Sequence, residues 1–326
     1  MTATAASSFH SALRAWGQLD APVSAALATQ LNRLKHSHLL VRGFSESRQL
    51  VSWLHAALND CSGAPPPEPD ACQLRYTLPG AIVPPPASYR NVSHCREEYY
   101  STHPYSSHCA SLDVMLSFEW KSSQYSMHDA AFHDKVERAV AASAQTGRRV
   151  IVLLSGGPHH FSKFADHKHS MHFSLPDSFA IPQRWVTNYY IDTERLLRSF
   201  TSGTLPNGGA RACVLWKTSN VGPRLGDARG QRPRKAHHPS ARNGIHDWLN
   251  RFTRAMAVHL GIGVLDLTDL TASVTPNPNP KAPSPHARAG EGGGGTAEVE
   301  GDYYHGFPSS LLLQPFVQRL SDACAL

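Results

Sequence analysis

The pattern of apolar and polar positions along the chain changes period several times, and these changes predict an alternating order of strands and helices. Buried strands are indicated where a short apolar run ends at a glycine or a polar turn. The clearest is RRVIVLLSGG, in which five consecutive apolar residues, Val150 to Leu154, precede a glycine pair. The other predicted strands cover 38–43, 111–120, 210–219 and 263–267.

Helices are predicted between these strands by apolar residues that recur every three or four positions. Residues 48–58 place Leu50, Val51, Leu54 and Leu58 on one face of such a helix. A second helix over 129–144 has Asp129 as its predicted N-cap and Gly147 just past its end. The remaining predicted helices cover 185–200, 240–260 and 308–320.

Strands that alternate with helices predict one α/β domain. The expected fold is a three-layer α/β/α sandwich with a mostly parallel central sheet, because parallel sheets are covered by helices on both faces. Residues 1–36 are expected to form a helical lead-in, and residues 37–326 a single domain. Within it, residues 273–300 are so rich in Pro, Gly and small polar residues that a disordered insertion is predicted.

Composition excludes several other classes of protein. The 326 residues are 41% hydrophobic and 17% charged, which is typical of a globular chain, and the net charge is +6. Much of this charge lies in RLGDARGQRPRKAHHPSAR, where neither stacking aromatic residues nor a helical motif accompany it. We therefore expect a solvated loop and no nucleic-acid partner. We also expect a monomer without a membrane span, because no apolar run is long enough to cross a bilayer.

The cysteines and the chain start leave the cellular compartment open. No signal peptide is visible in the first twenty residues. The six cysteines contain no C-x-x-C pair, so no zinc motif is predicted. Cys95 and Cys109 flank a loop and are candidates for a disulfide under oxidising conditions, although spacing alone does not decide pairing. The single sequon at Asn91 matters only in a secretory pathway.

Three loops follow predicted strands and carry residues suited to catalysis. In open α/β sheets the ligand binds at the carboxyl ends of the strands, where such loops meet. GFSESR (43–48) follows the first strand, SGGPHH (155–160) the third, and GDYYHG (301–306) the last. Ser45 of the first loop is the candidate nucleophile, because the turn exposes its hydroxyl before a helix. Ser47 is a rival that we expect to cap the helix. Arg48 could pack over the site or pair with a carboxylate such as Glu46, and a solvated arginine is the simpler expectation.

The other two loops offer partners for that serine. Asp302 and His305 are three residues apart, so the carboxylate can orient the imidazole as a general base. Gly157 lets backbone N–H groups approach a ligand closely, and His159 adds a side-chain donor to a developing oxyanion. Each loop taken singly has a simpler structural explanation: Asp302 caps the last helix, and the glycines form a tight turn. The order of the three along the chain favours a shared site.

This combination resembles the SGNH (GDSL-type) hydrolases, and more closely their PC-esterase branch, which includes polysaccharide O-acetyltransferases. Gly43-Phe44-Ser45-Glu46-Ser47-Arg48 stands where the family carries Gly-Asp-Ser followed by Arg. Gly157-Pro158-His159 is similar to the Gly-x-His block, and Asp302-Tyr303-Tyr304-His305 to the Asp-x-x-His block. VLWKTSNVGP (214–223) is similar to the strand that ends in Trp-Arg-Thr. The resemblance covers the chain from about residue 39 to its C-terminus.

The resemblance implies an SGNH-like fold and a serine esterase or O-acyltransferase that needs no metal or cofactor. Ser45 would attack the ester of an acylated, carbohydrate-like substrate, with His305 as base and Asp302 orienting it. Gly43, Gly157, His159 and Arg48 would bind substrate or the oxyanion. Relatives in this branch are often anchored in the Golgi, so the resemblance allows a Golgi or secretory location and the compartment stays open. Phe44 departs from the family's aspartate and the 273–300 insertion precedes Asp302, so an inactive carbohydrate-binding relative is the alternative.

Three further alternatives remain open from the sequence. The histidine-rich stretch HHFSKFADHKHSMHF could bind zinc, although its H-x-H spacing matches no helical ligand pair. An α/β-hydrolase would need glycine where Ser47 stands in its G-x-S-x-G elbow. A non-catalytic groove could be lined by aromatic residues, which are equally common in cores and rims; the candidates are Tyr99, Tyr100, Tyr105 and Trp120.

Overall fold

The computed structural model describes residues 19, 21–43, 45–62, 105–120, 130–156, 183–201, 212–220, 239–273 and 309–326. Its helices are α2 (Ala25–Asn32), α3 (Ser45–Leu58), α6 (Ala130–Thr146), α8 (Gln183–Thr201), α9 (Pro239–His259), α10 (Thr268–Ser273) and α11 (Ser309–Ala323). Its strands are β1 (Ser37–Gly43), β2 (Tyr105–Cys109), β3 (Val114–Trp120), β4 (Arg149–Ser155), β5 (Ala212–Lys217) and β6 (Gly263–Leu265).

The described strands form one six-stranded sheet in the order β2-β3-β1-β4-β5-β6. Neighbouring strands are parallel from β3 to β6, and only the β2–β3 hairpin at one edge is antiparallel. The predicted α/β class with a mostly parallel sheet is therefore confirmed. β1 lies inside the sheet, with β3 on one side and β4 on the other. After β1 the chain therefore adds β3 beside it on one side and later β4 on the opposite side.

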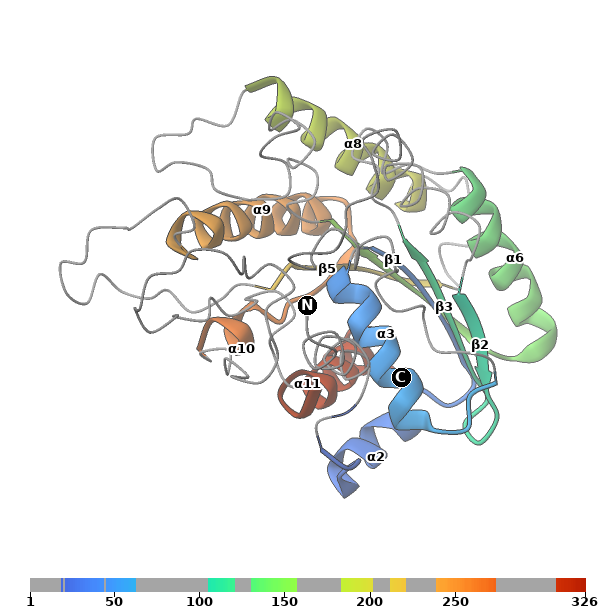
Figure 1. Cartoon of the computed structure of the whole chain (residues 1–326). Coiled ribbons are helices and arrows are strands. Elements are labelled where there is room, and N and C mark those ends of the chain that lie inside the picture. The colour runs from blue at the N-terminus through green and yellow to red at the C-terminus, as the bar shows by residue number, and fades with distance from the viewer. Residues whose placement is uncertain are drawn as a thin grey trace, which may run out of the picture.

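Helices cover both faces of this sheet (Figure 1). Successive strand residues face opposite sides, and β1 shows it: Leu39 and Val41 pack in the hydrophobic cluster that includes α2, α3 and α11. Leu40 packs in a second cluster with α6, α8 and α9. The arrangement is compatible with the α/β/α sandwich expected from the sequence.

The predicted elements are found with shifted ends. α3 begins at Ser45, three residues earlier than the apolar periodicity suggests. β3 begins at Val114, because Asp113 has a positive φ of 52° in the preceding turn. Gly147 has a φ of 68° directly after α6, as predicted for a residue past a helix end.

β2 was not predicted, because its sequence YSSHC has no apolar run. Of the predicted insertion, Ser273 ends α10 and the rest lies outside the described residues.

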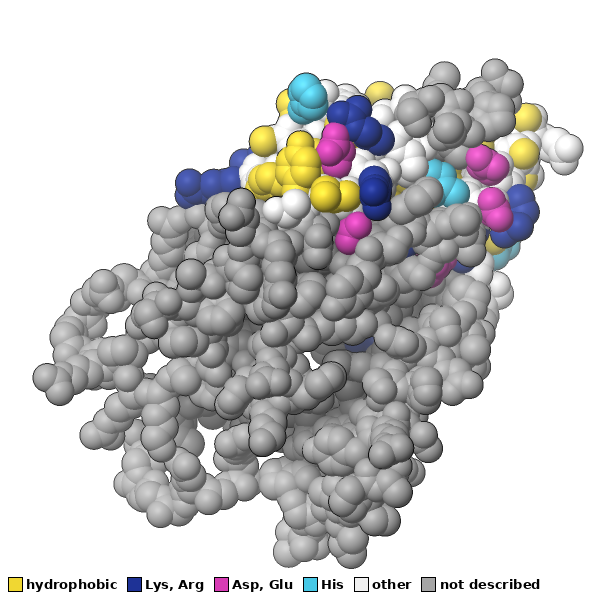
Figure 2. Space-filling view, turned by 90° about the horizontal axis from the view of Figure 1, so that it is seen from above, with side chains coloured by type: hydrophobic (Ala, Val, Ile, Leu, Met, Phe, Trp, Pro, Cys, Tyr) yellow, Lys and Arg dark blue, Asp and Glu magenta, His cyan; other side chains and the backbone are white. Residues whose placement is uncertain are grey.

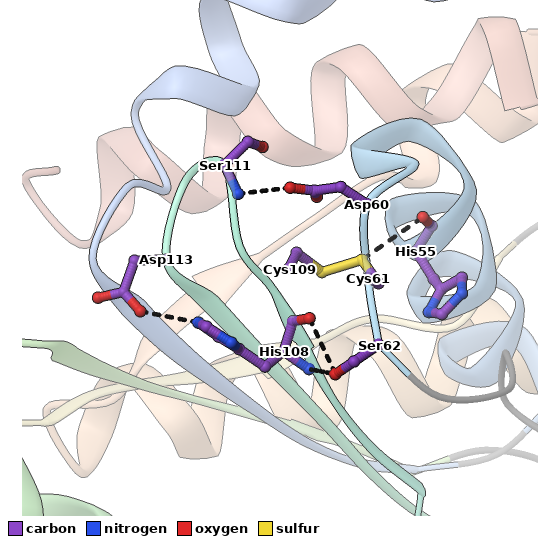
Figure 3. Close-up of a disulfide and its surroundings, with 8 residues drawn as sticks. All are labelled: His55, Asp60, Cys61, Ser62, His108, Cys109, Ser111 and Asp113. Carbon is purple, nitrogen blue, oxygen red and sulfur yellow. Dashed lines mark hydrogen bonds and ion pairs between the residues drawn. A yellow bond between two sulfur atoms is a disulfide. The ribbon is translucent and has the colours of Figure 1, made fainter.

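Two disulfides join distant parts of the described chain. Cys61, after α3, is bonded to Cys109 at the end of β2 (Figure 3). The pairing suggested between Cys95 and Cys109 is therefore wrong; an antiparallel bridge places Cys61 directly opposite Cys109. Cys213 in β5 is bonded to Cys324, one residue past α11. Each bond closes a long loop, of 48 and 111 residues respectively, and so restricts the unfolded chain.

A charged cluster around Asp113 holds the amino-terminal edge of the sheet. Arg148, just before β4, donates to Asp113 Oδ1 at 2.6 Å. His108 Nε2 lies 2.9 Å from the same oxygen, a contact drawn as a dashed line in Figure 3. His36 Nδ1 lies 3.1 Å from Oδ2. The Arg148 guanidinium, followed by the two imidazoles, holds the pKa of the Asp113 carboxyl well below its usual range. One carboxylate thus joins the β2–β3 turn to the segments that lead into β1 and β4.

The outer surface of the α6–α8–α9 layer carries some exposed apolar side chains among charged ones (Figure 2). The most exposed are Tyr190 and Ile191 of α8 and Val258 of α9. Tyr190 also packs at a tilt against Phe252 of α9, with ring centroids 5.3 Å apart. Within the part of the chain that the structure describes, no helix combines the length and apolar character needed to cross a membrane.

The environment of His38 predicts a loss of stability in mild acid. Burial, and then the charges of Lys135 and Arg148, lower its pKa from 6.5 to about 4. The unfolded chain therefore binds more protons than the folded one between these values, and the free energy of unfolding falls as pH drops from 6.5 towards 4. Urea unfolding at pH 7 and pH 5 measures this loss.

The matched variant is His38→Gln, which retains a polar group opposite Ser117 Oγ, 3.0 Å from His38 Nε2 in the wild type. The difference in pH dependence between wild type and variant isolates His38, because His55, whose pKa is also lowered by burial, is present in both proteins. An unchanged pH dependence in His38→Gln would contradict the assignment.

Candidate functional site

A group of buried, hydrogen-bonded polar residues lies at the carboxyl ends of β1, β4 and β5. If the antiparallel edge strand β2 is set aside, the remaining order β3-β1-β4-β5-β6 is that of a doubly wound fold. The chain moves from β1 to β3 on one side and then to β4 on the other, so the strand order reverses at β1. Ligands of such sheets bind at this switch point, outside the carboxyl ends of the strands. Here that place is the end of β1 beside β4, and α3 begins directly above it.

Three small or polar residues form a row beneath the first turn of α3. Ser155 at the end of β4 is paired in register with Lys217 at the end of β5, and Gly43 of β1 is the next position after the Arg42–Leu154 pair. All three point to the α3 side of the sheet, because they lie two residues beyond apolar residues of that core. The apolar core thus gives way to polar contacts where α3 starts.

Gly43 is required for the close approach of α3 to β4. A Cβ at this position would lie 2.0 Å from Ser155 Oγ and 2.8 Å from Ser47 Oγ. Both hydroxyls therefore occupy the space that a side chain would take. The role expected for Gly43 in the oxyanion or substrate site remains a prediction; the described contacts give it a packing role.

The hydroxyls of Ser47 and Ser155 are hydrogen-bonded to each other at 2.7 Å. Ser47 is 1% exposed and lies inside α3, two residues after the helix begins. The prediction that Ser47 caps this helix is therefore wrong, because α3 starts earlier. Its hydroxyl instead links the first turn of α3 to the end of β4.

Glu46 makes a second link, from α3 to the end of β5. Its Oε2 accepts hydrogen bonds from Lys217 Nζ at 3.1 Å and from the backbone N–H of Asn220 at 2.9 Å. Lys217 is 1% exposed and Glu46 is 9% exposed, so the ion pair is buried. Lys217 Nζ also donates to the carbonyl oxygen of Thr218 at 2.8 Å. Buried charges persist in proteins when they are paired and hydrogen-bonded in this way.

The segment after β5 is fixed on its other side as well. The Asn250 amide of α9 both accepts from the Ser219 N–H and donates to the Ser219 carbonyl oxygen, each at 2.9 Å. Ser219 Oγ donates to the carbonyl oxygen of Gly156 at 3.0 Å, and Thr218 Oγ1 donates to Asp266 Oδ1 at 2.9 Å. Residues 218–220 therefore connect the loop after β4 with α3, α9 and the end of β6.

Arg48 lies in the first turn of α3 and is 2% exposed. It is not the solvated arginine that the sequence suggested, and Glu46 forms its ion pair with Lys217. The expected contact of Arg48 with substrate is untested by this packing. Arg48 is instead a buried residue of the same helical turn that begins at Ser45.

The structure brings together only part of the site expected from the sequence. Ser45 is the first residue of α3, although its side chain lies outside the described atoms. Four other expected site residues also lie outside them: Gly157, His159, Asp302 and His305. The same holds for the histidine-rich stretch and for Tyr99, Tyr100 and the side chains of Tyr105 and Trp120.

The described residues place Asp60, Cys61 and Cys109 close enough to share a metal ion. The two sulfur atoms are bonded to each other, so neither is a thiolate that could bind a metal. The second carboxylate oxygen of Asp60 accepts from the backbone N–H of Ser111. This group therefore holds the β2–β3 turn rather than an ion.

Sequence reasoning missed four residues that build this edge, namely Ser155, Lys217, Ser219 and Asn250. Lys217 and Ser219 stand in the VLWKTSNVGP segment, and their place at a strand end was a usable signal. Asn250 gave none, because a single amide within a long helix has many ordinary explanations.

Gly43→Ala is expected to lower the free energy of unfolding by about 1–3 kcal/mol, because the added methyl group overlaps Ser155 Oγ. Chemical denaturation measures the change. The control is Gly43→Ala combined with Ser155→Ala, which removes the nearest of the atoms that the new methyl group meets and leaves Ser47 Oγ in place. The two substitutions should be less destabilising together than the sum of the single effects, and simple additivity would contradict the packing role.

Comparison of this chain with models of protein families, with curated proteins and with solved structures finds no match in any of the three. The assignment of a function therefore depends on the motifs in the sequence and on the geometry of the carboxyl edge. Among the described residues, that geometry centres on the turn between β1 and α3.

Proposed function

We propose that the protein is a serine esterase or O-acyltransferase of the SGNH type, acting on acyl esters of carbohydrate-like substrates. The observation that carries the proposal is the position of Ser45. It begins α3 two residues after the end of β1, at the switch point of a mostly parallel sheet. This is the place where folds of this class bind their ligands.

The start of α3 suits a nucleophile and the anion formed from its substrate. The first turn of a helix presents backbone N–H groups without partners in the helix, and its positive end favours negative charge. The turn is also held in place from below by Ser155 and Lys217. Hydrogen-bond donors fixed before the reaction are the most effective means of stabilising an oxyanion.

The direction of α11 supports a role for the distant Asp302 and His305. The end of α11 is tied to the amino ends of β5 and β1, through the Cys213–Cys324 disulfide and the Arg33–Asp322 ion pair at 2.8 Å. Arg319, about one turn before the end of α11, reaches Asp269 at 2.7 Å, beyond the carboxyl end of β6. α11 therefore runs opposite to the strands.

The length of α11 brings its start to the carboxyl edge of the sheet. Its 15 residues span about 22 Å, and a six-residue strand such as β5 spans about 20 Å. His305 precedes Ser309 by four residues, which reach at most about 14 Å. Chain length thus allows the imidazole of His305 to meet the hydroxyl of Ser45, as the proposed triad requires.

In the proposed mechanism, His305 takes the proton of the Ser45 hydroxyl as its oxygen attacks the ester carbonyl carbon. Asp302 orients the imidazole, and the N–H groups of Ser45 and Gly157, with His159, stabilise the oxyanion. The alcohol leaves with the proton held by His305. Water or a sugar hydroxyl then attacks the acyl-enzyme, which releases Ser45.

Ser45→Ala is expected to lower the rate of aryl acetate hydrolysis by about 10³-fold or more, because it removes the nucleophile. Ser47→Ala, in the same turn, should lower the rate far less, because Ser47 supports the turn through Ser155 but does not attack the substrate. Equal rates for Ser45→Ala and wild type would remove Ser45 from the mechanism.

Covalent labelling separates the two serines directly. Trypsin cleaves after Arg42 and Arg48, so both serines fall in the peptide 43–48. After treatment with an aryl fluorophosphonate, fragmentation of this peptide should place the label on Ser45. A label on Ser47, or none in this peptide, would contradict the proposal.

A further inference from the structure

We propose that Glu46 and Lys217 form a positioning pair that sets the orientation of the Ser45 turn. This inference rests on the proposed function. Phe44 stands before Ser45, so within the 43–48 turn the acidic side chain comes from Glu46, on the other flank of the serine. Glu46 is adjacent to Ser45 in the first turn of α3, so a shift of its side chain moves the start of the helix.

A single carboxylate oxygen joins the turn to two groups of the neighbouring loop. Glu46 Oε2 accepts from both Lys217 Nζ and the Asn220 N–H, at 3.1 and 2.9 Å. The first donor ends β5 and the second is three residues further along the chain. Rotation of the Glu46 side chain would break both bonds together, so this contact restricts the turn more than a single hydrogen bond would.

The far side of this contact is itself immobilised. Asn250 holds both backbone groups of Ser219 at 2.9 Å, and Ser219 Oγ is bonded to the Gly156 carbonyl oxygen at 3.0 Å. Glu46 is therefore attached to a loop that α9 and the end of β4 already fix. Glu46, the residue next to the proposed nucleophile, is thereby held in a fixed position relative to β5 and α9.

Burial strengthens the ion pair between Glu46 and Lys217. Lys217 is 1% exposed, so water does not compete for its ammonium group, and the low dielectric strengthens the attraction to Glu46. The Asp113–Arg148 pair at the opposite edge of the sheet provides a matched contrast. It too joins loops through one carboxylate, but Asp113 is 28% exposed and lies far from the carboxyl ends of the strands.

The test compares Glu46→Gln and Lys217→Met with Asp113→Asn as the control for loss of an ion pair. Active enzyme is counted by titration with the fluorophosphonate, so that a misfolded fraction does not enter kcat. A displacement on the order of 1 Å costs about 10²-fold. We expect kcat per titrated site to fall roughly 10–100-fold for both variants, with KM little changed.

The control Asp113→Asn should melt at a lower temperature and keep its kcat per site. Lys217→Arg, which keeps the charge, should recover most of the activity that Lys217→Met loses. A purely structural role for the pair would lower the melting temperature and the number of titrated sites but leave kcat per site unchanged. That result would overturn the proposal.

Hydrogen exchange gives a second readout that needs no activity. Glu46→Gln should speed exchange by about tenfold or more in peptides that cover 43–50 and 216–222, because both ends of the contact are released. Unchanged exchange there overturns the positioning pair even if Ser45→Ala abolishes activity. Faster exchange in a protein without esterase activity would instead reject the proposed function and keep the pair as a structural contact.

We further infer, from an independent observation, that the protein acquires its disulfides in an oxidising compartment. The four cysteines within the described residues are all paired, across 48 and 111 residues of chain. One bond fixes the β2 edge strand and the other fixes the end of α11. Proteins kept in reducing compartments rarely form such bonds, whereas secreted and lumenal proteins retain them.

Peptide mapping without reduction, on protein isolated from its own cells and alkylated at once, tests this inference. We expect Cys61 linked to Cys109 and Cys213 linked to Cys324, with none of the four alkylated. Reduction, or either of the variants Cys61→Ser and Cys213→Ser, should lower the melting temperature by roughly 5–10 °C. Folded native protein with these four cysteines alkylated would overturn it.

Discussion

The contact of the first turn of α3 with the row formed by Gly43, Ser155 and Lys217 determines the geometry of the carboxyl edge. A glycine is needed in this row because two hydroxyls fill the space beside its Cα. The serine and the lysine then bind successive residues of the turn, Ser47 and Glu46. Short and directional polar contacts thus replace apolar packing at the point where a helix must begin at a defined position over three strands.

Much of the architecture could be predicted from the apolar pattern, because buried parallel strands such as β4 are continuous apolar runs with polar ends. β2 could not, since an edge strand buries little and its polar sequence carries no such signal. The early start of α3 was missed for a related reason. Its first turn is buried by polar residues, Glu46 to Arg48, which an apolar periodicity does not detect.

The site was less predictable than the fold. The motifs pointed to the loop after β1, and the structure gives that loop a position at the switch point, while its catalytic role stays a prediction. They misjudged the packing of Ser47 and Arg48, because both were expected in an exposed turn, whereas both side chains are buried. The partners of Glu46 lie about 170 residues away in sequence, and contacts of such separation become visible only when the strand order is known.

The edges of the described sheet have a consequence for solubility. β2 at one edge has five residues, carries serine and histidine side chains, and is bonded covalently through Cys109. β6 at the other edge has three residues. Short, polar or tethered edge strands offer few free backbone groups for pairing with another molecule. The long apolar strands β1 and β4, which would aggregate readily if they stood at an edge, are enclosed between them.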